Sequence, residues 1–196
     1  MVCSIDTTSY SAPMEIFMKP ISPLMIEHRL IDRMLALLTR EHLRIIETGN
    51  VDYEFLDASI IFLKTYVDKF HHGKEEDILF KELAEKPLSP EDRKMLNELI
   101  EEHGRTRKAV ERLESARRQQ IDKKLAITEI TKHMETLTKW YPVHIEKEDK
   151  HFFVSSMNYL SEHEQAAMLE RSREFDRSFT QHRFVGIITE LEATKK

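Results

Sequence analysis

The chain is poor in residues that break helices, form disulfides or cross membranes. Of its 196 residues only four are glycine, six are proline and one, Cys3, is cysteine. A single cysteine excludes an internal disulfide and is typical of a reducing compartment, while few breakers beside many Leu, Glu, Lys and Arg favour helix. No apolar run reaches the length of a membrane span, and no charged-then-apolar signal segment opens the sequence. We therefore expect a helical, cytoplasmic protein with no membrane partner.

Blocks of one charge are also missing. The formal net charge is −5, and the acidic and basic residues are interleaved rather than clustered. A nucleic-acid partner would require a basic patch, so we expect none. The sequence contains no nucleophile triad, phosphate-binding loop or dinucleotide fingerprint, which leaves the corresponding enzyme classes unsupported. With 40% hydrophobic residues, the chain is long enough to bury one substantial core.

A histidine-carboxylate pattern occurs twice. His71 and Glu75 lie four residues apart, as do His144 and Glu148, and each glutamate is followed five positions later by a phenylalanine. Positions i and i+4 share one face of a helix, so both side chains of a pair can bind the same metal centre. One such pair is usually a surface ion pair. Two pairs in the same register favour a shared site.

Each pair is preceded by a Glu-His dipeptide. His28 lies 43 residues before His71, and His103 lies 41 residues before His144. The chain is therefore a two-fold repeat of a histidine followed by His-x-x-x-Glu. Such a repeat is typical of a helical bundle with a site at its centre.

Helix-start and helix-stop signals divide the chain into four long helices and a C-terminal one. Capping residues, prolines and glycine mark most of the boundaries, and the weakest turn has neither glycine nor proline. The fourth helix is expected to bury Trp140. In chain order the signals are Ser22-Pro23, Gly49-Asn50, Asp52, Pro87, Ser89-Pro90, the weak turn near residues 121–124, and a capping box that starts at Ser161.

These signals predict an all-α fold, an up-and-down antiparallel four-helix bundle with an additional C-terminal helix. Residues 1–20 are expected to be a flexible N-terminal arm, 21–156 the bundle, and 157–196 an accessory C-terminal helical segment. Past Phe179 that segment is either continuous or broken near Gly186.

The positions of the turns test whether the histidines share one layer. Residues on adjacent antiparallel helices lie at the same level only if they are equally far from the turn between them. The midpoints between His28, the centre of the first His-Glu pair, His103 and the centre of the second pair are 50.5, 88 and 124.5. Each midpoint falls in or at the edge of an expected turn. The candidates should therefore converge, and such a buried layer needs metal or charge pairing.

The donor set suits a pair of metal ions. Histidine and glutamate without sulfur fit iron, manganese or zinc, whereas a structural zinc site would need only four ligands. Four histidines and two glutamates are too many for one tetrahedral ion and fit two ions. The candidate metal ligands are His28, His71, Glu75, His103, His144 and Glu148.

With these motifs the chain resembles the hemerythrin family, in the branch called the HHE cation-binding domain, over roughly Pro23 to Phe153. The resemblance implies that the six candidates are the ligands of two iron ions, which the two glutamates bridge, with manganese or zinc as possible substitutes. The pair His71 and Glu75 is preferred over His72 and Glu76, because its spacing to the next phenylalanine matches that of the second repeat. We expect His72 and Glu76 to be a surface or outer pair.

One position departs from the family pattern. The oxygen-carrying hemerythrins have a second histidine four residues after the one on the third helix, and here that position is Arg107. A guanidinium does not bind a metal ion. One ion would therefore be under-coordinated, or would take a water or another side chain, and the site would be more open and reactive.

The leading hypothesis is a non-haem di-iron protein that binds dioxygen, nitric oxide or peroxide as a sensor, scavenger or carrier. The alternative is a di-iron redox enzyme, either an oxidase or peroxidase or a protein that repairs damaged iron-sulfur clusters. A third hypothesis is a metal-dependent interaction module in which the C-terminal helix docks a protein partner, whose identity the sequence does not give.

Overall fold

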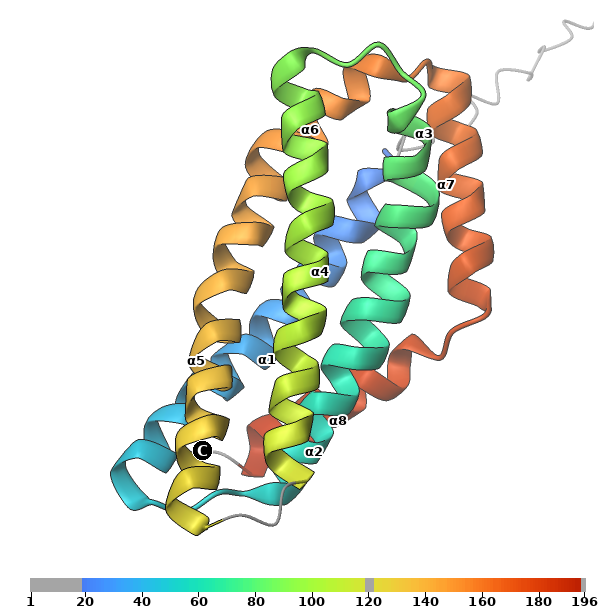
Figure 1. Ribbon diagram of the computed structural model, residues 1–196. Helices are drawn as coiled ribbons and strands as arrows, with labels where there is room; N and C mark the ends of the chain where they lie inside the picture. The colour runs from blue at the N-terminus through green and yellow to red at the C-terminus, as the bar shows by residue number, and fades with distance from the viewer. Residues whose placement is uncertain (1–18, 119–121, 195–196) are drawn as a thin grey trace, which may run out of the picture.

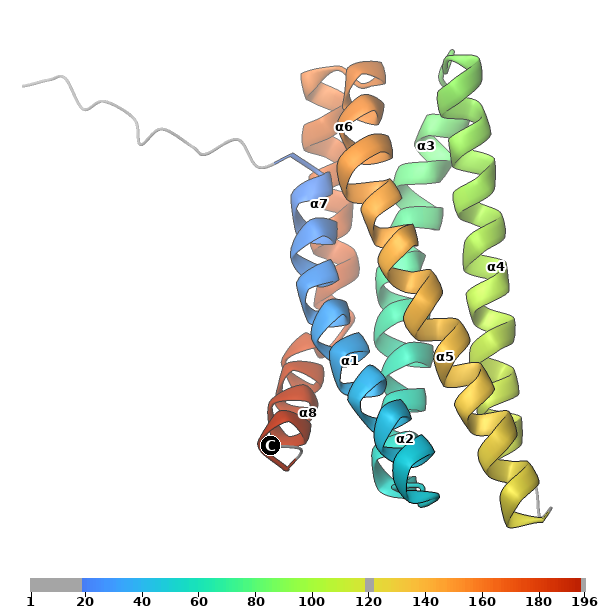
Figure 2. The same ribbon diagram turned by 90° about the vertical axis from the view of Figure 1, so that its left-hand side faces the viewer.

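The computed structural model describes residues 19–118 and 122–194, and within these ranges the chain contains helices and short connections but no strand. Four long helical runs lie side by side with roughly aligned axes (Figures 1 and 2). The predicted all-α class is confirmed. Most of the expected N-terminal arm lies outside the described residues.

Two of the four runs are single helices, and the other two change helix type along their length. The first run is α1 (Ile21–Thr48) and the third is α4 (Pro90–Arg118). The second joins α2 (Tyr53–Ile61), η1 (Phe62–His72), η2 (Glu75–Phe80) and α3 (Lys81–Ala84), and the fourth joins α5 (Lys123–Lys147), η3 (Glu148–Phe152), α6 (Phe153–Ser156) and η4 (Met157–Tyr159). The segments η1, η2 and η3 are π-helical. π-Helices are rare in proteins as a whole, but those that occur are often found at functional sites.

Local capping sets most of the boundaries as predicted. Gly49 ends α1 in the left-handed conformation, with φ of 64°, and its amide donates to the carbonyl of Ile45. The side chain of Asp52 accepts a hydrogen bond from the amide of Phe55, and Ser161 forms the expected capping box.

The start of α1 differs from the prediction. The helix begins at Ile21 with Pro20 as its N-cap, and no side chain caps it. Ser22 therefore lies inside the first turn, where its amide bonds to the carbonyl of Lys19. Pro20 lacks an amide hydrogen and loses no hydrogen bond at this position, while Ile21 gains burial in the core.

The apolar interior consists of two clusters, one toward each end of the molecule. Along every run at least one histidine or glutamate of the repeat lies between the residues of the two clusters. On α1, for example, Leu24 belongs to one cluster and Leu30 to the other, and His28 lies between them. On α4 the corresponding residues are Leu99 and Ala109. The predicted site is therefore a polar layer with an apolar core on each side.

The C-terminal segment forms two helices, α7 (Glu162–Arg177) and α8 (Gln181–Thr194), rather than one. The helix is interrupted near Ser178, and Gly186 lies inside α8. The segment is therefore neither one continuous helix nor broken near Gly186, the two alternatives that were expected. The break lets Phe179 stack on Phe70 with ring centroids 4.3 Å apart, and lets α8 pack against α1 and η1. Figure 2 shows α8 beside α1.

Trp140 was expected in the core but is 44% exposed. Tyr141 takes the inward position on this turn of α5 and is buried. Over the described residues, none of the helices combines the length and the apolar character that crossing a bilayer demands.

Two glycine substitutions compare a helix end with a helix interior: Gly49 ends α1, and Gly186 lies inside α8. Gly49→Ala should lower the free energy of unfolding by about 1 kcal/mol, because alanine is disfavoured at positive φ. Gly186→Ala should instead raise it by about 0.5–1 kcal/mol, because alanine is the better helix former and its Cβ would meet no atom within 4 Å. Urea unfolding of both variants measures this, and equal effects would contradict the assigned turn.

Candidate metal centre

The six predicted site residues meet in the polar layer between the two apolar cores. His28 comes from α1, His103 from α4, and one His-Glu pair from each of the other two runs. All six are buried. The ring centroids of His28 and His71 are 4.6 Å apart, and those of His103 and His144 are 4.9 Å apart.

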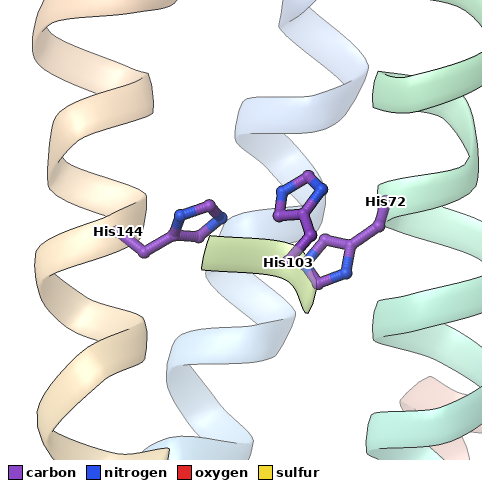
Figure 3. A group of neighbouring side chains, drawn as sticks. All are labelled: His72, His103 and His144. Carbon is purple, nitrogen blue, oxygen red and sulfur yellow. The ribbon is translucent and has the colours of Figure 1, made fainter. Parts of the chain in front are cut away.

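The donor atoms form two groups. One ligand atom from each of His28, His71, Glu75 and Glu148 lies within 4.8 Å of the others. The second group contains His103 and His144 together with His72, within the same limit. Figure 3 shows the three imidazoles of the second group approaching from three different runs. We call these the first and the second cluster.

His72 was expected in a surface or outer pair, and the surface alternative is wrong, since its side chain is only 1% exposed. Its ring stacks on that of His103 with centroids 3.8 Å apart. Consecutive residues of a helix point in different directions, so His71 faces the first cluster while His72 faces the second. Arg107 stands where a further histidine was expected on the neighbouring run, and the structure shows that His72 lines the same pocket as Arg107.

Each glutamate faces both clusters with its two oxygens. Glu75 places Oε1 3.3 Å from Nε2 of His71 and Oε2 3.4 Å from Nε2 of His103. Glu148 places Oε2 3.3 Å from Nε2 of His28 and Oε1 3.3 Å from Nε2 of His144. A carboxylate in this position can bridge two ions.

The unpaired polar atoms test whether cations fit here. Among residues 19–118 and 122–194, nine buried side-chain nitrogen or oxygen atoms make no hydrogen bond, and eight belong to this layer. They include both oxygens of Glu75 and of Glu148 and the Nε2 atoms of three histidines. An unpaired buried carboxylate is very costly, and metal ions between these atoms would remove that cost. The donor set therefore fits two cations.

The two carboxylates also perturb each other. Burial and the charge of Glu148 raise the pKa of Glu75 well above its ordinary value. Burial alone would raise the pKa of Glu148 too, but the nearby imidazoles, His144 first, hold it well below the ordinary value. Two facing carboxylates in one buried site cannot both be charged without positive charge nearby.

Four carboxylates outside the clusters orient the imidazoles. Each accepts a hydrogen bond from the Nδ1 of one histidine, which leaves that ring's Nε2 free to act as a metal ligand. The four distances are 2.7 Å from His28 to Asp149, 3.0 Å from His71 to Glu27, 2.6 Å from His103 to Glu76 and 2.9 Å from His144 to Glu102.

Cations in turn hold these outer carboxylates. Lys74 contacts Glu27, and Lys147 donates to Glu102 at 2.5 Å. The two lysines lie 73 residues apart, as do the two His-Glu pairs. The repeat therefore includes the lysines and the outer carboxylates that they contact, which we call the second layer of charge.

Arg107 holds another of the outer carboxylates, Glu76, as the two lysines hold Glu27 and Glu102. It donates to Glu76 at 2.7 Å and to Asp68 at 2.5 Å, and Glu76 in turn accepts from His103. The guanidinium thus orients a histidine of the second cluster from outside, although it cannot serve as a ligand.

A pocket of about 80 Å³ reaches the second cluster from the surface. His72, Thr106, Arg107 and Tyr141 are among the residues that line it. Burial raises the pKa of the Tyr141 phenol well above its ordinary value, so this hydroxyl stays protonated and can donate a hydrogen bond. A space of this size admits a few waters or a small molecule.

Comparison with known proteins identifies the domain type. The Hemerythrin HHE cation binding domain matches residues 19–154. No curated protein and no solved structure matches the chain significantly. The family match covers the first three runs, the fourth run as far as residue 154, and all of the residues of both clusters.

Glu75→Gln should separate two effects of this buried carboxylate, which are its effect on the stability of the metal-free protein and its contribution to metal binding. The metal-free variant is expected to be at least as stable as the wild type, because it no longer buries two facing carboxylates. Metal should stabilise it less than the wild type, which gains about 2.7 kcal/mol at a free metal concentration 100 times its dissociation constant. Thermal unfolding with chelator and with metal measures both, and Asp77→Asn, an exposed change on the same helix, is the control. A destabilised metal-free variant that keeps its full metal response would contradict this.

His72→Gln tests whether His72 belongs to the second cluster. The substitution should weaken one of two metal equivalents by more than the roughly tenfold that loss of an outer hydrogen-bond partner costs. Competition titration with a chelator of known affinity measures this. His151→Gln, which changes an exposed histidine on η3, should leave both equivalents unchanged. Unaltered binding by the His72 variant would place this residue outside the metal site.

Proposed function

The chain belongs to the hemerythrin family of HHE cation-binding domains, and from that premise we propose that it holds two iron ions and binds a small diatomic molecule or peroxide beside them. The four runs would form the expected up-and-down antiparallel bundle, with α7 and α8 as additions to it. Manganese and zinc are possible substitutes for iron. A cytoplasmic location remains a prediction.

The proposed ligands follow the two clusters. His28 and His71 would hold the first ion, and His72, His103 and His144 the second, while Glu75 and Glu148 would bridge them. The observation that carries this proposal is the convergence of eight unpaired buried donor atoms in one layer. An outer hydrogen bond fixes the ring of every histidine in this set except His72, as preformed metal sites require.

The two clusters are unequal. The second offers three imidazoles and the first offers two, in addition to the two shared carboxylates. The first ion would therefore have fewer protein ligands than the second. When bound, the ion pair supplies exchangeable positions and reversible oxidation, which is the chemistry that binding dioxygen, nitric oxide or peroxide requires.

The surrounding residues would control access and proton supply. Phe153 stacks on His28 and Phe80 stacks on His103, with centroids 5.8 and 5.7 Å apart, so apolar rings exclude water from the layer. The pocket beside His72 gives a small molecule a path inward. The protonated Tyr141 hydroxyl on its wall can donate a hydrogen bond to an oxygen atom that enters there.

A redox enzyme is the second candidate. Tyr141 favours it, because a phenol hydroxyl beside the pocket could donate a hydrogen bond to an oxygen atom of dioxygen or peroxide while that molecule is reduced. The two functions separate by turnover. A sensor, scavenger or carrier gives a reversible change in the near-ultraviolet and visible spectrum, whereas an enzyme continues to consume oxidant while reductant is supplied.

Metal analysis of protein purified without added metal tests the proposal directly. We expect about two irons per chain in the wild type and loss of both in Glu148→Ala, because this carboxylate faces both clusters. Glu146→Ala removes an exposed carboxylate two residues away and should retain the full content. Metal content that is absent from the wild type, or equal in the two variants, would contradict a dinuclear centre.

A further inference from the structure

The helix α7 reaches the metal layer at one point. Phe175 packs against both apolar clusters, so it lies at the level of the polar layer that separates them. Its ring contacts the backbone of the second run closely, since a Cβ on Gly73 would lie 3.1 Å from its Cζ atom. Glycine at position 73 thus permits α7 to approach the chain between His72 and Lys74.

Asp176, the next residue of α7, contacts the second layer of charge. Its Oδ1 accepts a hydrogen bond from Nζ of Lys74 at 2.7 Å. The side chain of Lys74 is only 1% exposed, and its ammonium group also contacts Glu27 and lies 4.0 Å from the centroid of the Phe70 ring. Glu27 accepts from Nδ1 of His71. A continuous chain of contacts therefore leads from α7 to an imidazole of the first cluster.

The other half of the repeat lacks this contact. Lys147, the counterpart of Lys74, is 22% exposed, and beyond Glu102 its second partner is Glu98, at 3.5 Å. Glu98 lies on α4, one of the four long runs, rather than on a C-terminal helix. The two halves share the lysine and the outer carboxylate, but among the residues that the structure describes only the lysine of the first half pairs with a residue of a C-terminal helix.

We propose that Asp176 is a positioning residue through which the docked C-terminal helices set the metal affinity of the first cluster. Lys74 faces two carboxylates, and Asp176 fixes its ammonium group so that Glu27 holds the His71 ring in place. Without Asp176, the buried ammonium group has Glu27 as its remaining anionic partner and pulls that carboxylate away from the imidazole. The proposal rests on the dinuclear site described above.

The test compares Asp176→Asn with Glu98→Gln by titrating the metal-free full chain with cobalt(II) against a competing chelator. Asp176→Asn should weaken one of the two equivalents by about tenfold and leave the other unchanged. Glu98→Gln removes the matching carboxylate from the other half and should leave both within about twofold, because that contact is longer and exposed. Asp176→Glu, which keeps the charge, should restore part of the lost affinity.

A second measurement separates positioning from general destabilisation. In the cobalt-loaded protein each ligand histidine with a bound Nδ1 proton gives a shifted proton resonance, and Asp176→Asn should move or broaden one of the four. Gly73→Leu, which displaces Phe175 while keeping every charge, should weaken the same equivalent. Asp176 is 35% exposed, so its amide variant is expected to fold, and circular dichroism checks this.

The outcomes distinguish the two proposals. A wild type that binds no cobalt overturns the dinuclear site itself. A wild type that binds two equivalents, beside an Asp176→Asn variant that matches it or that loses both equivalents alike, overturns the role of Asp176 and leaves the site intact. Equal weakening by Glu98→Gln would also overturn it.

Discussion

The structure depends on two buried carboxylates that face each other and are surrounded by imidazoles. Glu75 and Glu148 leave all four oxygens without a hydrogen bond, in a layer between two apolar cores. Burial of such a pair opposes folding unless positive charge lies between the two groups. This requirement explains why histidines from four runs converge on the layer, and why the surrounding charges are ordered so regularly.

Charge alternates outward from that centre. Central glutamates are followed by imidazoles, then by carboxylates such as Glu27 and Glu102, and then by Lys74 and Lys147. Each layer satisfies the one inside it, so the donor atoms are oriented before any ion arrives. Preorientation of this kind lowers the cost of binding, because little side-chain freedom remains to be lost.

The sequence predicted much of this centre because its geometry is encoded locally. Spacing of four places His71 and Glu75 on one helix face, and turn signals such as Gly49 and Asp52 fix the levels of the runs. The outer carboxylates were also within reach, since each is the sequence neighbour of a ligand, as Glu76 is of Glu75. His72 was missed because its role depends on which side of its run the second cluster lies. That is a tertiary fact, and no local pattern states it.

The same limit explains the other differences. Trp140 and Tyr141 both follow the apolar pattern of α5, and only the packing of the neighbouring helices decides which of them is buried. The end of α7 near Ser178 carries no glycine or proline, and it is set by the stacking of Phe179 on Phe70.

The two apolar cores have a consequence for how the molecule unfolds. Each core is continuous within its own end, and between them lie mainly histidines and acids, which contribute little hydrophobic stabilisation. Cooperative unfolding requires that the loss of one region destabilise the next. The polar layer contributes little to this coupling between the two cores. Cations in the layer would make the two ends melt as a single unit. In their absence the coupling between the two ends is weaker, so the sharpness of the melting transition, and not only its midpoint, should reflect occupancy.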